Sequence, residues 1–368
     1  MTAPLVELIR EHITRNGPLT FDTFMELALY HPDLGYYASR APGAGTGYRT
    51  SPSLGPWFGR LLARAFDRMW RALGKPSLFT VVEVGAGAAD LAATAIDSAE
   101  EPFASALRWH LVEPFPAVER LQRQRLQRVA HSVAWSRSLR DLAAVEGCVL
   151  ANEVLDNLPV HLLEVESGRA REICVALEDG RLVESPRPVF SPALEEAATT
   201  PLALLDDGAR FEVCLGFHAW AAEAAGALAR GYLLVIDYGD SEPGIWTRRP
   251  AGTLVTYREE QIGFDLLAHP GLGDITAHVN FSALERAVAA AGMQVQRLAP
   301  QRDFLAALGV AGAAEELHAA EGAARASGLH GEALALLAER SRLASLTAPG
   351  LGDMLALLAA SGAAPPVL

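Results

Sequence analysis

The sequence predicts an α/β fold: a Rossmann-like sheet with a helical amino-terminal segment, an inserted β-rich layer and a helical carboxyl-terminal tail. Three observations predict it. From residue 78 onward, short apolar runs alternate with helical patterns, which is typical of parallel strands joined by right-handed crossovers. Residues 160–215 contain alternating segments separated by Ser-Gly and Asp-Gly turns, which indicate an antiparallel layer. After residue 302 the chain is rich in alanine and helical in pattern.

The amino-terminal residues 1–38 are predicted to form helix, turn and helix. "PLVELIREHITRN" and "TFDTFMELALY" both space their apolar residues by three and four, and Gly17-Pro18 separates them. "HPDLGYYASRAPGAGTGYRTSP" lacks such periodicity and is predicted as an ordered loop with a function. "LGPWFGRLLARAFDRMWRAL" is predicted as a further helix, which ends at Gly74.

The strands of the core sheet are predicted at "LFTVVEVG", "LRWHLVEP", "SVAWSRS" and "GCVLANEV". The sheet is expected to resume at "YLLVIDYG", with further strands at "GTLVTY" and "MQVQRLA". The predicted domains are amino-terminal helices with an active-site loop (1–75), a Rossmann-like core (76–159 and 228–300), an inserted substrate or partner subdomain (160–227) and a helical tail (301–368).

Composition excludes several classes of protein. The chain has 368 residues, half of them apolar, which allows a large core. Its net charge of -13 disfavours binding to nucleic acid, and the Arg-rich segment 120–128 is interpreted as the solvated face of a helix. No apolar run is long enough to span a membrane, and the amino terminus lacks the pattern of a signal or transit peptide. A cytoplasmic location is therefore expected.

The three cysteines, Cys148, Cys174 and Cys214, lie in apolar, strand-like contexts without CxxC spacing. This pattern indicates neither a disulfide framework nor a zinc site. We expect no metal.

A glycine loop follows the first core strand in "VVEVGAGAADLAATA", residues 81–95. Glycines at a turn from strand to helix let the backbone approach a ligand, and the helix amino terminus offers free N–H groups. Ala88, Ala89 and Asp90 follow Gly85-Ala86-Gly87, so an acid lies where a diphosphate would come nearest. S-adenosylmethionine (SAM) carries a sulfonium and no phosphate, and it suits this loop better than a dinucleotide.

Polar residues follow two other predicted strands. Glu113 ends the second strand, where an acid can accept both ribose hydroxyls of a nucleoside. Asn152, Glu153 and Asp156 follow the fourth strand. Each residue also has a structural interpretation: the glycines as a tight turn, Glu113 as an exposed acid, Asn152 and Asp156 as helix caps. The whole set, in order on consecutive strands, favours a SAM site.

The same segments resemble a known family. The likeness spans about residues 5–310, and "NEVLDNLPV" and "DITAHVNFSAL" are its most specific blocks. The chain resembles the MidA-like SAM-dependent methyltransferases, whose mitochondrial member methylates an arginine of a respiratory complex I subunit during assembly. It carries the likeness in "GPLTFDTFMELALYHPDLGYY", "RTSP", "FGRLLARAFDRMW", "VEVGAGAADLA", "LVEPFP", "ANEVLDNLPVHLLE", "LLVIDYGD", "GTLVTYRE" and "GDITAHVNFSAL".

The resemblance implies a SAM-dependent methyltransferase with S-adenosylhomocysteine as product. Asp237 and Tyr238 would lie near the substrate, although Asp237 also suits a helix cap and His278 a core histidine. The methyl acceptor would be a protein, a peptide or a small molecule. A homodimer is a possible assembly. The residues implied are, for cofactor binding, Glu83, Gly85, Ala86, Gly87, Glu113, Pro114, Asn152 and Ser51, and for catalysis, Glu153, Asp156, Asn152, Asp274 and His278.

Three positions differ from the family pattern. Gly47-Tyr48-Arg49 precedes Thr50-Ser51-Pro52 in a loop that is one residue shorter than the family's and lacks its acid. The family's third loop glycine is replaced around Ala89, and Thr94 replaces an acid that is usual further along the helix. Arg49 would repel an arginine substrate, so methylation of a small metabolite or natural product stays open beside protein arginine methylation. A catalytically weak, SAM-binding assembly factor is a further alternative, and a dinucleotide oxidoreductase is disfavoured by Ala89 and Asp90.

Methyl transfer from a sulfonium is an in-line displacement, which a protein accelerates by positioning the reactants and excluding water. A guanidinium acceptor is cationic and needs carboxylates that orient it. Glu153 and Asp156 are the candidates for that role, with Asn152 holding either donor or acceptor.

Overall fold

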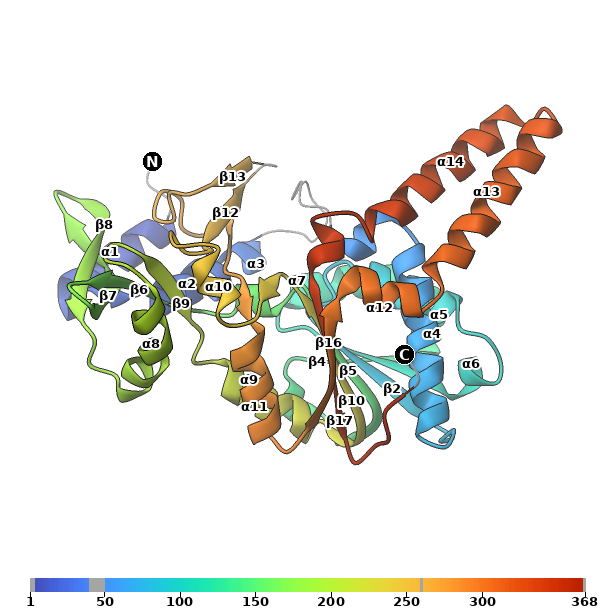
Figure 1. The fold of residues 1–368 in the computed structure, drawn as a ribbon, viewed down its shortest axis with the longest axis horizontal. Coiled ribbons are helices and arrows are strands. Elements are labelled where there is room, and N and C mark those ends of the chain that lie inside the picture. Colours follow the sequence, from blue (N-terminus) through green and yellow to red (C-terminus); the bar gives the residue numbers. More distant parts are fainter. Residues whose placement is uncertain (1–3, 40–49, 259–260, 367–368) are drawn as a thin grey trace. The chain divides into compact units, whose positions relative to one another are not determined.

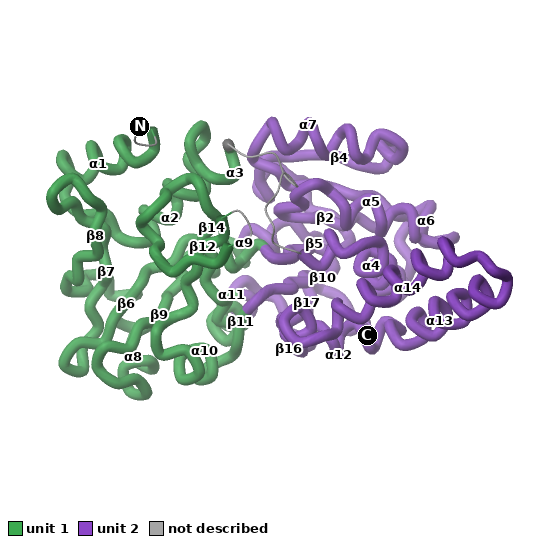
Figure 2. The backbone as a smooth tube through the Cα atoms, turned by 90° about the horizontal axis from the view of Figure 1, so that it is seen from above, with its two compact units in different colours: residues 1–48, 154–221, 239–287 green, residues 49–153, 222–238, 288–368 purple. Residues whose placement is uncertain are grey.

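The computed structural model describes residues 4–39, 50–258 and 261–366, and it divides into two compact units that Figure 2 colours separately. The units are bounded differently from the predicted domains, whose functional division stays a prediction. Unit 1 comprises residues 1–48, 154–221 and 239–287, and unit 2 comprises residues 49–153, 222–238 and 288–368.

Unit 2 contains a seven-stranded sheet in the order β16-β17-β10-β5-β2-β3-β4. The five strands from β10 to β4 pair in parallel, and β17 pairs antiparallel with both β10 and β16. The carboxyl ends of the parallel strands share one edge of the sheet, which is where open α/β folds bind ligands. The strands are β2 (Phe79–Val84), β3 (Leu107–Val112), β4 (Val133–Ser136), β5 (Val145–Asn152), β10 (Leu228–Asp237), β16 (Gln294–Pro300) and β17 (Leu355–Ser361).

The strand β17 was not predicted from the sequence. Its residues belong to the alanine-rich tail, yet the chain returns there and inserts a strand between β16 and β10. The preceding helices form as expected, and Figure 1 shows α13 and α14 side by side as a helical hairpin. The helices of unit 2 are α4 (Trp57–Ala72), α5 (Asp90–Asp97), α6 (Phe103–Ala106), α7 (Pro116–Arg125), α12 (Gln301–Ala307), α13 (Val310–Ala326) and α14 (His330–Ser345), with short 3-10 turns at Ser51–Leu54, Gln127–Ser132, Leu139–Asp141 and Leu351–Asp353.

The helix α4 supplies much of the unit 2 core. Its apolar residues recur at helical spacing, so Phe58, Leu62, Phe66 and Met69 are fully buried on one face. They belong to one cluster with Phe79 and other sheet residues. Each such side chain contributes about 1.5–3 kcal/mol when buried, which anchors the helix to the sheet that carries the site.

Unit 1 contains the inserted antiparallel layer that the turns predicted. Its largest sheet has the order β1-β7-β6-β9, with β8 paired to β7, and smaller sheets pair β11 with β15 and β12 with β13 and β14. The strands are β1 (Leu19–Thr20), β6 (His161–Glu166), β7 (Arg169–Glu178), β8 (Arg181–Pro188), β9 (Arg210–Val213), β11 (Gly239–Asp240), β12 (Val255–Arg258), β13 (Gln261–Gly263), β14 (Asp274–Thr276) and β15 (Val279–Asn280).

The predicted amino-terminal helices pack within unit 1. Residues Ile9 of the first helix and Phe24 of the second are fully buried in a cluster with Ile173 and Val175 of β7. Two further helices, α9 and α11, contain points at which the chain passes between the units. The helices are α1 (Pro4–Asn16), α2 (Phe21–Tyr30), α3 (Tyr36–Ser39), α8 (Pro192–Leu204), α10 (Gly244–Thr247), α9 (Phe217–Gly226) and α11 (Phe281–Ala290), with a 3-10 turn at Leu155–Asn157.

The α/β fold class is confirmed, with its mostly parallel sheet and its helical segments at both ends. None of the helices in the described ranges combines the length and the apolar character that crossing a membrane requires.

Candidate functional site

The glycine loop of unit 2 connects β2 to α5. Gly85 and Gly87 have φ angles of 66° and 51°, in the left-handed region that glycine adopts without strain. A Cβ at Gly87 would meet no atom within 4 Å, so the loop leaves open space beside its backbone. Ala89, which stands where the family pattern has a third glycine, is buried and also left-handed, with φ 63°. The turn thus keeps a glycine conformation without the glycine.

Asp90 and Thr94, which follow this loop, both have structural partners. Asp90 begins α5, and its carboxylate lies 2.8 Å from an Arg125 nitrogen, so its charge is partly compensated and repels a phosphate less than the sequence suggested. Thr94, which replaces the family's acid, packs against Gly59 of α4. A Cβ at Gly59 would come within 1.9 Å of Thr94 Oγ1. Thr94 therefore serves the close packing of α4 on α5.

Glu83, the last acid before the loop, is buried and accepts a hydrogen bond from Trp109 Nε1 at 2.8 Å. Burial raises the pKa of this carboxyl to about 8, although the indole hydrogen bond opposes the rise. Glu83 is therefore largely neutral at pH 7, and it ties β2 to its neighbour β3.

Glu113 lies directly after β3 and is also buried. Its Oε1 accepts from the Phe115 backbone N–H at 3.0 Å, and its Oε2 accepts from Gln122 Nε2 at 3.0 Å. Burial raises the pKa of Glu113 to about 7 against both hydrogen bonds. Each oxygen has a further lone pair, so the fixed carboxylate can still accept from a ligand. The neighbouring Pro114 is exposed.

Gln122 is a residue that the sequence analysis missed. It is fully buried, donates to Gly87 O at 3.0 Å as well as to Glu113, and accepts from Trp135 Nε1 at 3.1 Å. It therefore joins the glycine loop to the acid after β3. The segment around it was interpreted only as a solvated helix face. The available signal was the buried stripe Val118, Gln122, Leu126, with a polar residue in the middle.

A second polar group forms at the carboxyl end of β5. Glu153 Oε1 accepts from the Ser51 backbone N–H at 3.0 Å and from Asn152 Nδ2 at 3.2 Å. The backbone of Glu153 is left-handed, with φ 53°, a strained geometry that is frequent at functional sites. Ser51 itself is buried and lies 3.4 Å from the Gln301 side chain. Ser51 thus acts here as a support for Glu153.

Burial raises the pKa of Glu153 to about 8, with a smaller contribution from Asp237 at the end of β10, while the Ser51 and Asn152 hydrogen bonds lower it. Asp237 is buried and accepts from the Tyr238 backbone N–H at 2.8 Å. The carboxyl ends of β5 and β10 therefore bring two acids close enough to interact.

Two buried oxygens at this edge lack a hydrogen-bond partner within the described ranges. They are Asn152 Oδ1 and Glu153 Oε2. Buried acceptors without partners are costly, so these atoms fit a ligand that donates N–H groups. The open space at Gly87 and the fixed carboxylate of Glu113 fit a nucleoside. Together these features leave room for a nucleoside and for a second ligand that donates hydrogen bonds.

The remaining predicted catalytic residues belong to unit 1, where Asp274 organises one network. Its Oδ1 accepts from Tyr37 Oη and from Asn157 Nδ2, both at 2.9 Å. Tyr30 Oη donates to Asn157 O at 3.1 Å. Burial raises the pKa of Asp274 to about 7 against these hydrogen bonds. Tyr37 and Asn157 are further residues that the sequence analysis missed.

Asp156 lies one residue before Asn157, and its backbone carbonyl accepts from the Ala277 N–H at 2.8 Å. His278 belongs to another network, because its backbone N–H donates to Thr253 Oγ1 at 2.9 Å. Burial and, to a smaller extent, the charge of Arg249 lower the pKa of His278 to about 4. A pKa that far below 7 makes His278 a weak base, which favours a structural role.

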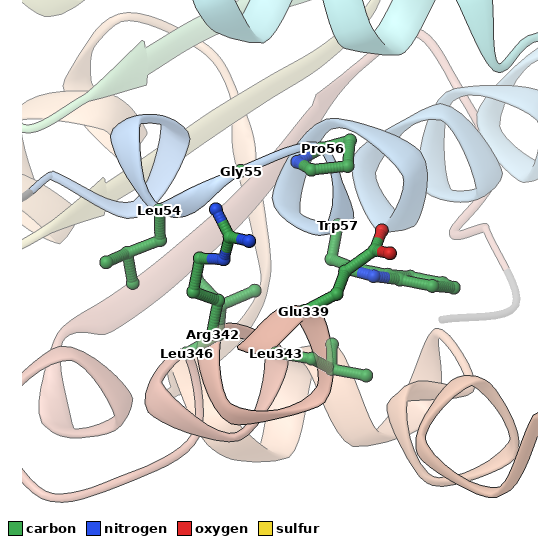
Figure 3. Close-up of a pocket in the computed structure, with 8 residues that line it drawn as sticks. All are labelled: Leu54, Gly55, Pro56, Trp57, Glu339, Arg342, Leu343 and Leu346. Atoms are coloured by element: carbon green, nitrogen blue, oxygen red, sulfur yellow. The ribbon is translucent and has the colours of Figure 1, made fainter. Parts of the chain in front are cut away.

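A small pocket in unit 2 is lined by the segment Leu54–Trp57 and by residues of α14 and Leu346. In Figure 3, Glu339 and Arg342 of α14 point toward the segment Leu54–Trp57. The Arg60 guanidinium carbon lies 4.7 Å from the centroid of the Trp57 ring. Arg60 Nη1 lies 3.5 Å from Glu339 Oε1. No predicted site residue lines the pocket, and its contacts fasten the carboxyl-terminal hairpin to the start of α4. Gly47, Tyr48 and Arg49 lie outside the described residues.

A family model described as "Putative S-adenosyl-L-methionine-dependent methyltransferase" matches residues 61–299, the segment that holds the glycine loop, Glu113 and Glu153. The chain belongs to this family. It is a SAM-dependent methyltransferase of the MidA-like type, and its cofactor is SAM.

The curated relatives are named as mitochondrial protein arginine methyltransferases. The protein NDUFAF7 of Danio rerio is 29% identical over 83% of this chain and 76% of its own length. That of Rattus norvegicus is 30% identical over 83% of this chain and 74% of its own length.

Two solved structures from Burkholderia thailandensis are similar throughout. A COG1565 superfamily member bound to S-adenosyl-homocysteine is 27% identical, covers 98% of this chain and 93% of its own, and has a TM-score of 0.87. A native structure of a COG1565 superfamily protein is 28% identical, covers 99% of this chain and 93% of its own, and has a TM-score of 0.84.

The comparison corrects one prediction. The cytoplasmic location expected from the amino-terminal sequence is wrong by this evidence, because the relatives carry mitochondrial names. The expectation depended on the absence of a recognisable targeting pattern. Amino-terminal composition alone is a weak indicator of subcellular location.

Proposed function

We propose that this methyltransferase N-methylates an arginine of a protein or peptide. Glu153 carries the proposal: among the described residues, its buried Oε2 at the carboxyl end of β5 lacks a hydrogen-bond partner, and so does Oδ1 of the adjacent Asn152. Two such acceptors suit the N–H groups of a guanidinium. The relatives named as protein arginine methyltransferases support the same acceptor.

The raised pKa of Glu153 fits this role. Without a cation nearby, the buried carboxyl keeps its proton below about pH 8. A bound guanidinium favours the charged carboxylate, since an opposite charge within a few ångströms lowers the pKa of an acid. Glu153 then orients the acceptor nitrogen and stabilises its charge. Ser51 and Asn152 hold Oε1, so that Oε2 is aimed at the acceptor.

The donor residues follow from the glycine loop. Gly85, Ala86 and Gly87 would lie against the amino acid end of SAM, and Glu113 would accept from the ribose hydroxyls. Gln122 fixes Glu113 relative to the loop. Glu83 and Pro114 flank these contacts, and Glu83 acts by holding β2 against β3. SAM would supply the methyl group: its S–CH₃ bond breaks as the N–CH₃ bond forms, S-adenosylhomocysteine leaves, and the proton lost from the acceptor nitrogen would pass to the Glu153 carboxylate.

Within unit 1, Asp156 and Asp274 are proposed as further acceptor residues. Asp274 is held in place by hydrogen bonds from Tyr37, Asn157 and the Ile275 backbone. His278 is proposed to have a structural role, since its backbone N–H donates to Thr253 Oγ1.

The test is transfer of a labelled methyl group from SAM to candidate proteins and peptides, followed by hydrolysis and identification of the methylated amino acid. Methylarginine is expected. Glu153→Gln should lower the rate by about 100-fold, because a well-placed charge stabilises a transition state by roughly 3 kcal/mol. Glu195→Gln, on the exposed face of α8, is the matched control and should leave the rate unchanged.

Transfer to a small molecule alone would overturn the arginine assignment and leave the methyltransferase activity intact. SAM binding without transfer to any acceptor would instead favour a binding factor. Calorimetric titration with SAM separates that outcome from a failure to bind the donor.

A further inference from the structure

Unit 1 contains a cluster of three potential metal ligands that the methyltransferase site does not use. Asp22 lies in the first turn of α2, His161 begins β6 and Glu172 belongs to β7. One ligand atom from each lies within 4.8 Å of the other two. Three separate elements therefore direct an imidazole and two carboxylates to one point.

The hydrogen bonding of this cluster is incomplete. His161 Nδ1 lies 2.7 Å from Glu172 Oε1 and 3.4 Å from Asp22 Oδ1. A single N–H on Nδ1 can donate well to only one of them. Among the described residues, Asp22 Oδ1 is a buried atom without a hydrogen-bond partner. A proton on Nδ1 thus satisfies Glu172 and leaves Asp22 unsatisfied.

A metal ion would satisfy all three atoms at once. Imidazole nitrogen and carboxylate oxygen bind zinc at about 2.0–2.2 Å, which separates neighbouring ligand atoms by roughly 3.4 Å in a tetrahedron. The Asp22 contact already has that length, and the Glu172 contact needs to open by less than an ångström.

Burial and access also suit an ion. The Glu172 side chain is 9% exposed and that of His161 is 15% exposed, so both are held by their surroundings. The Asp22 side chain is 29% exposed although its Oδ1 is buried, so the cluster lies near solvent, which could supply water as a fourth ligand.

We propose that Asp22, His161 and Glu172 bind one divalent transition-metal ion of the zinc type. The ion would join the first turn of α2 to strands β6 and β7 and would brace unit 1. The proposal is independent of the arginine assignment, and it departs from the expectation of no metal, which considered only the cysteines.

The test uses the full chain after dialysis against a chelator. Zinc chloride titrated in a calorimeter should bind at one ion per chain, and the melting temperature should rise with zinc. Cobalt(II) should give visible absorption bands on binding. His161→Ala should weaken zinc binding by at least about 10-fold and abolish the cobalt bands. Asp22→Asn should weaken binding as well.

His131→Ala, at an exposed histidine of unit 2, is the control and should bind as the wild type does. If Glu172→Gln or His161→Ala fails to fold, Asp22→Asn, at the exposed edge of the cluster, provides the decisive comparison. Absence of saturable zinc binding by the wild-type chain would overturn the proposal. So would equal zinc binding by wild type and a folded cluster variant, since the triad would then be an ion pair only.

Discussion

In unit 2, the Gln122 amide donates one hydrogen bond to the buried carboxylate of Glu113, at 3.0 Å. Its other amide hydrogen reaches Gly87 O in the glycine loop, also at 3.0 Å. This neutral side chain therefore sets the spacing between the two places where a nucleoside donor would be held. The proposed donor site thus depends on a residue that has no direct part in methyl transfer.

Gln122→Ala should weaken SAM binding by about 10-fold, because Glu113 and the loop lose their common support. It should also destabilise the fold by about 1–3 kcal/mol, the cost of leaving buried partners unsatisfied. Calorimetric titration with SAM and urea unfolding measure the two effects. Gln124→Ala, two residues along on the exposed face of α7, should change neither. Equal SAM affinity in wild type and Gln122→Ala would contradict this role.

Ala89→Gly should stabilise the chain by about 0.5–1 kcal/mol. Ala89 has φ 63°, where an L-residue with a Cβ is strained by roughly 1–2 kcal/mol, and the entropy that glycine loses on folding offsets part of the gain. Ala93→Gly, inside α5, should have the opposite sign and destabilise by about 1 kcal/mol. Chemical denaturation of the three proteins compares them. A destabilising Ala89→Gly would show that the buried methyl group of Ala89 contributes more than the relief of strain.

Glu83 should make stability depend on pH. Burial raises its pKa from 4.5 to about 8 in the folded chain. Between these values the folded state keeps a proton that the unfolded state releases, so the contribution is fully present below pH 4.5 and is lost as pH rises through 8. Glu83→Gln, which keeps an oxygen for Trp109, should lose less stability over that window. Urea midpoints at several pH values measure this, and an unchanged slope would refute it.

Ionisation of Glu153 should make the catalytic rate depend on pH. Its carboxyl is the group proposed to hold the guanidinium, and its pKa in the free protein is about 8. Because kcat/KM reports groups of the free enzyme, kcat/KM should rise with pH and level off above about 8. Glu153→Gln should be slow and should lack this limb. A limb that persists in the variant would assign the titration to another group.

The sequence predicted the sheet well where strands are continuously apolar. "TVVEV" and "LLVID" are short apolar runs that contain β-branched residues, which favours a strand over a helix. They form parts of β2 and β10. β17 escaped prediction because "LALLAAS" has strong helix formers, and its state is set by pairing with β10 and β16. In this segment, strand pairing outweighs the helix preference of the individual residues.

The site was predicted in part for a similar reason. Glycines and acids at the ends of strands can be recognised because parallel strands bring those ends to one edge. The partners that hold them are not local: Tyr37 contacts Asp274 across 237 positions of sequence, and Ser51 contacts Glu153 across 102. No pattern in a single sequence indicates such pairs.

The most direct measurement is a crystal structure of this chain with S-adenosylhomocysteine. We expect the adenosine beside the glycine loop, with both ribose hydroxyls within about 2.5–2.7 Å of the Glu113 carboxylate, and the sulfur directed toward the edge where Glu153 lies. A nucleoside bound elsewhere, with Glu113 still occupied only by Gln122 and Phe115, would contradict it.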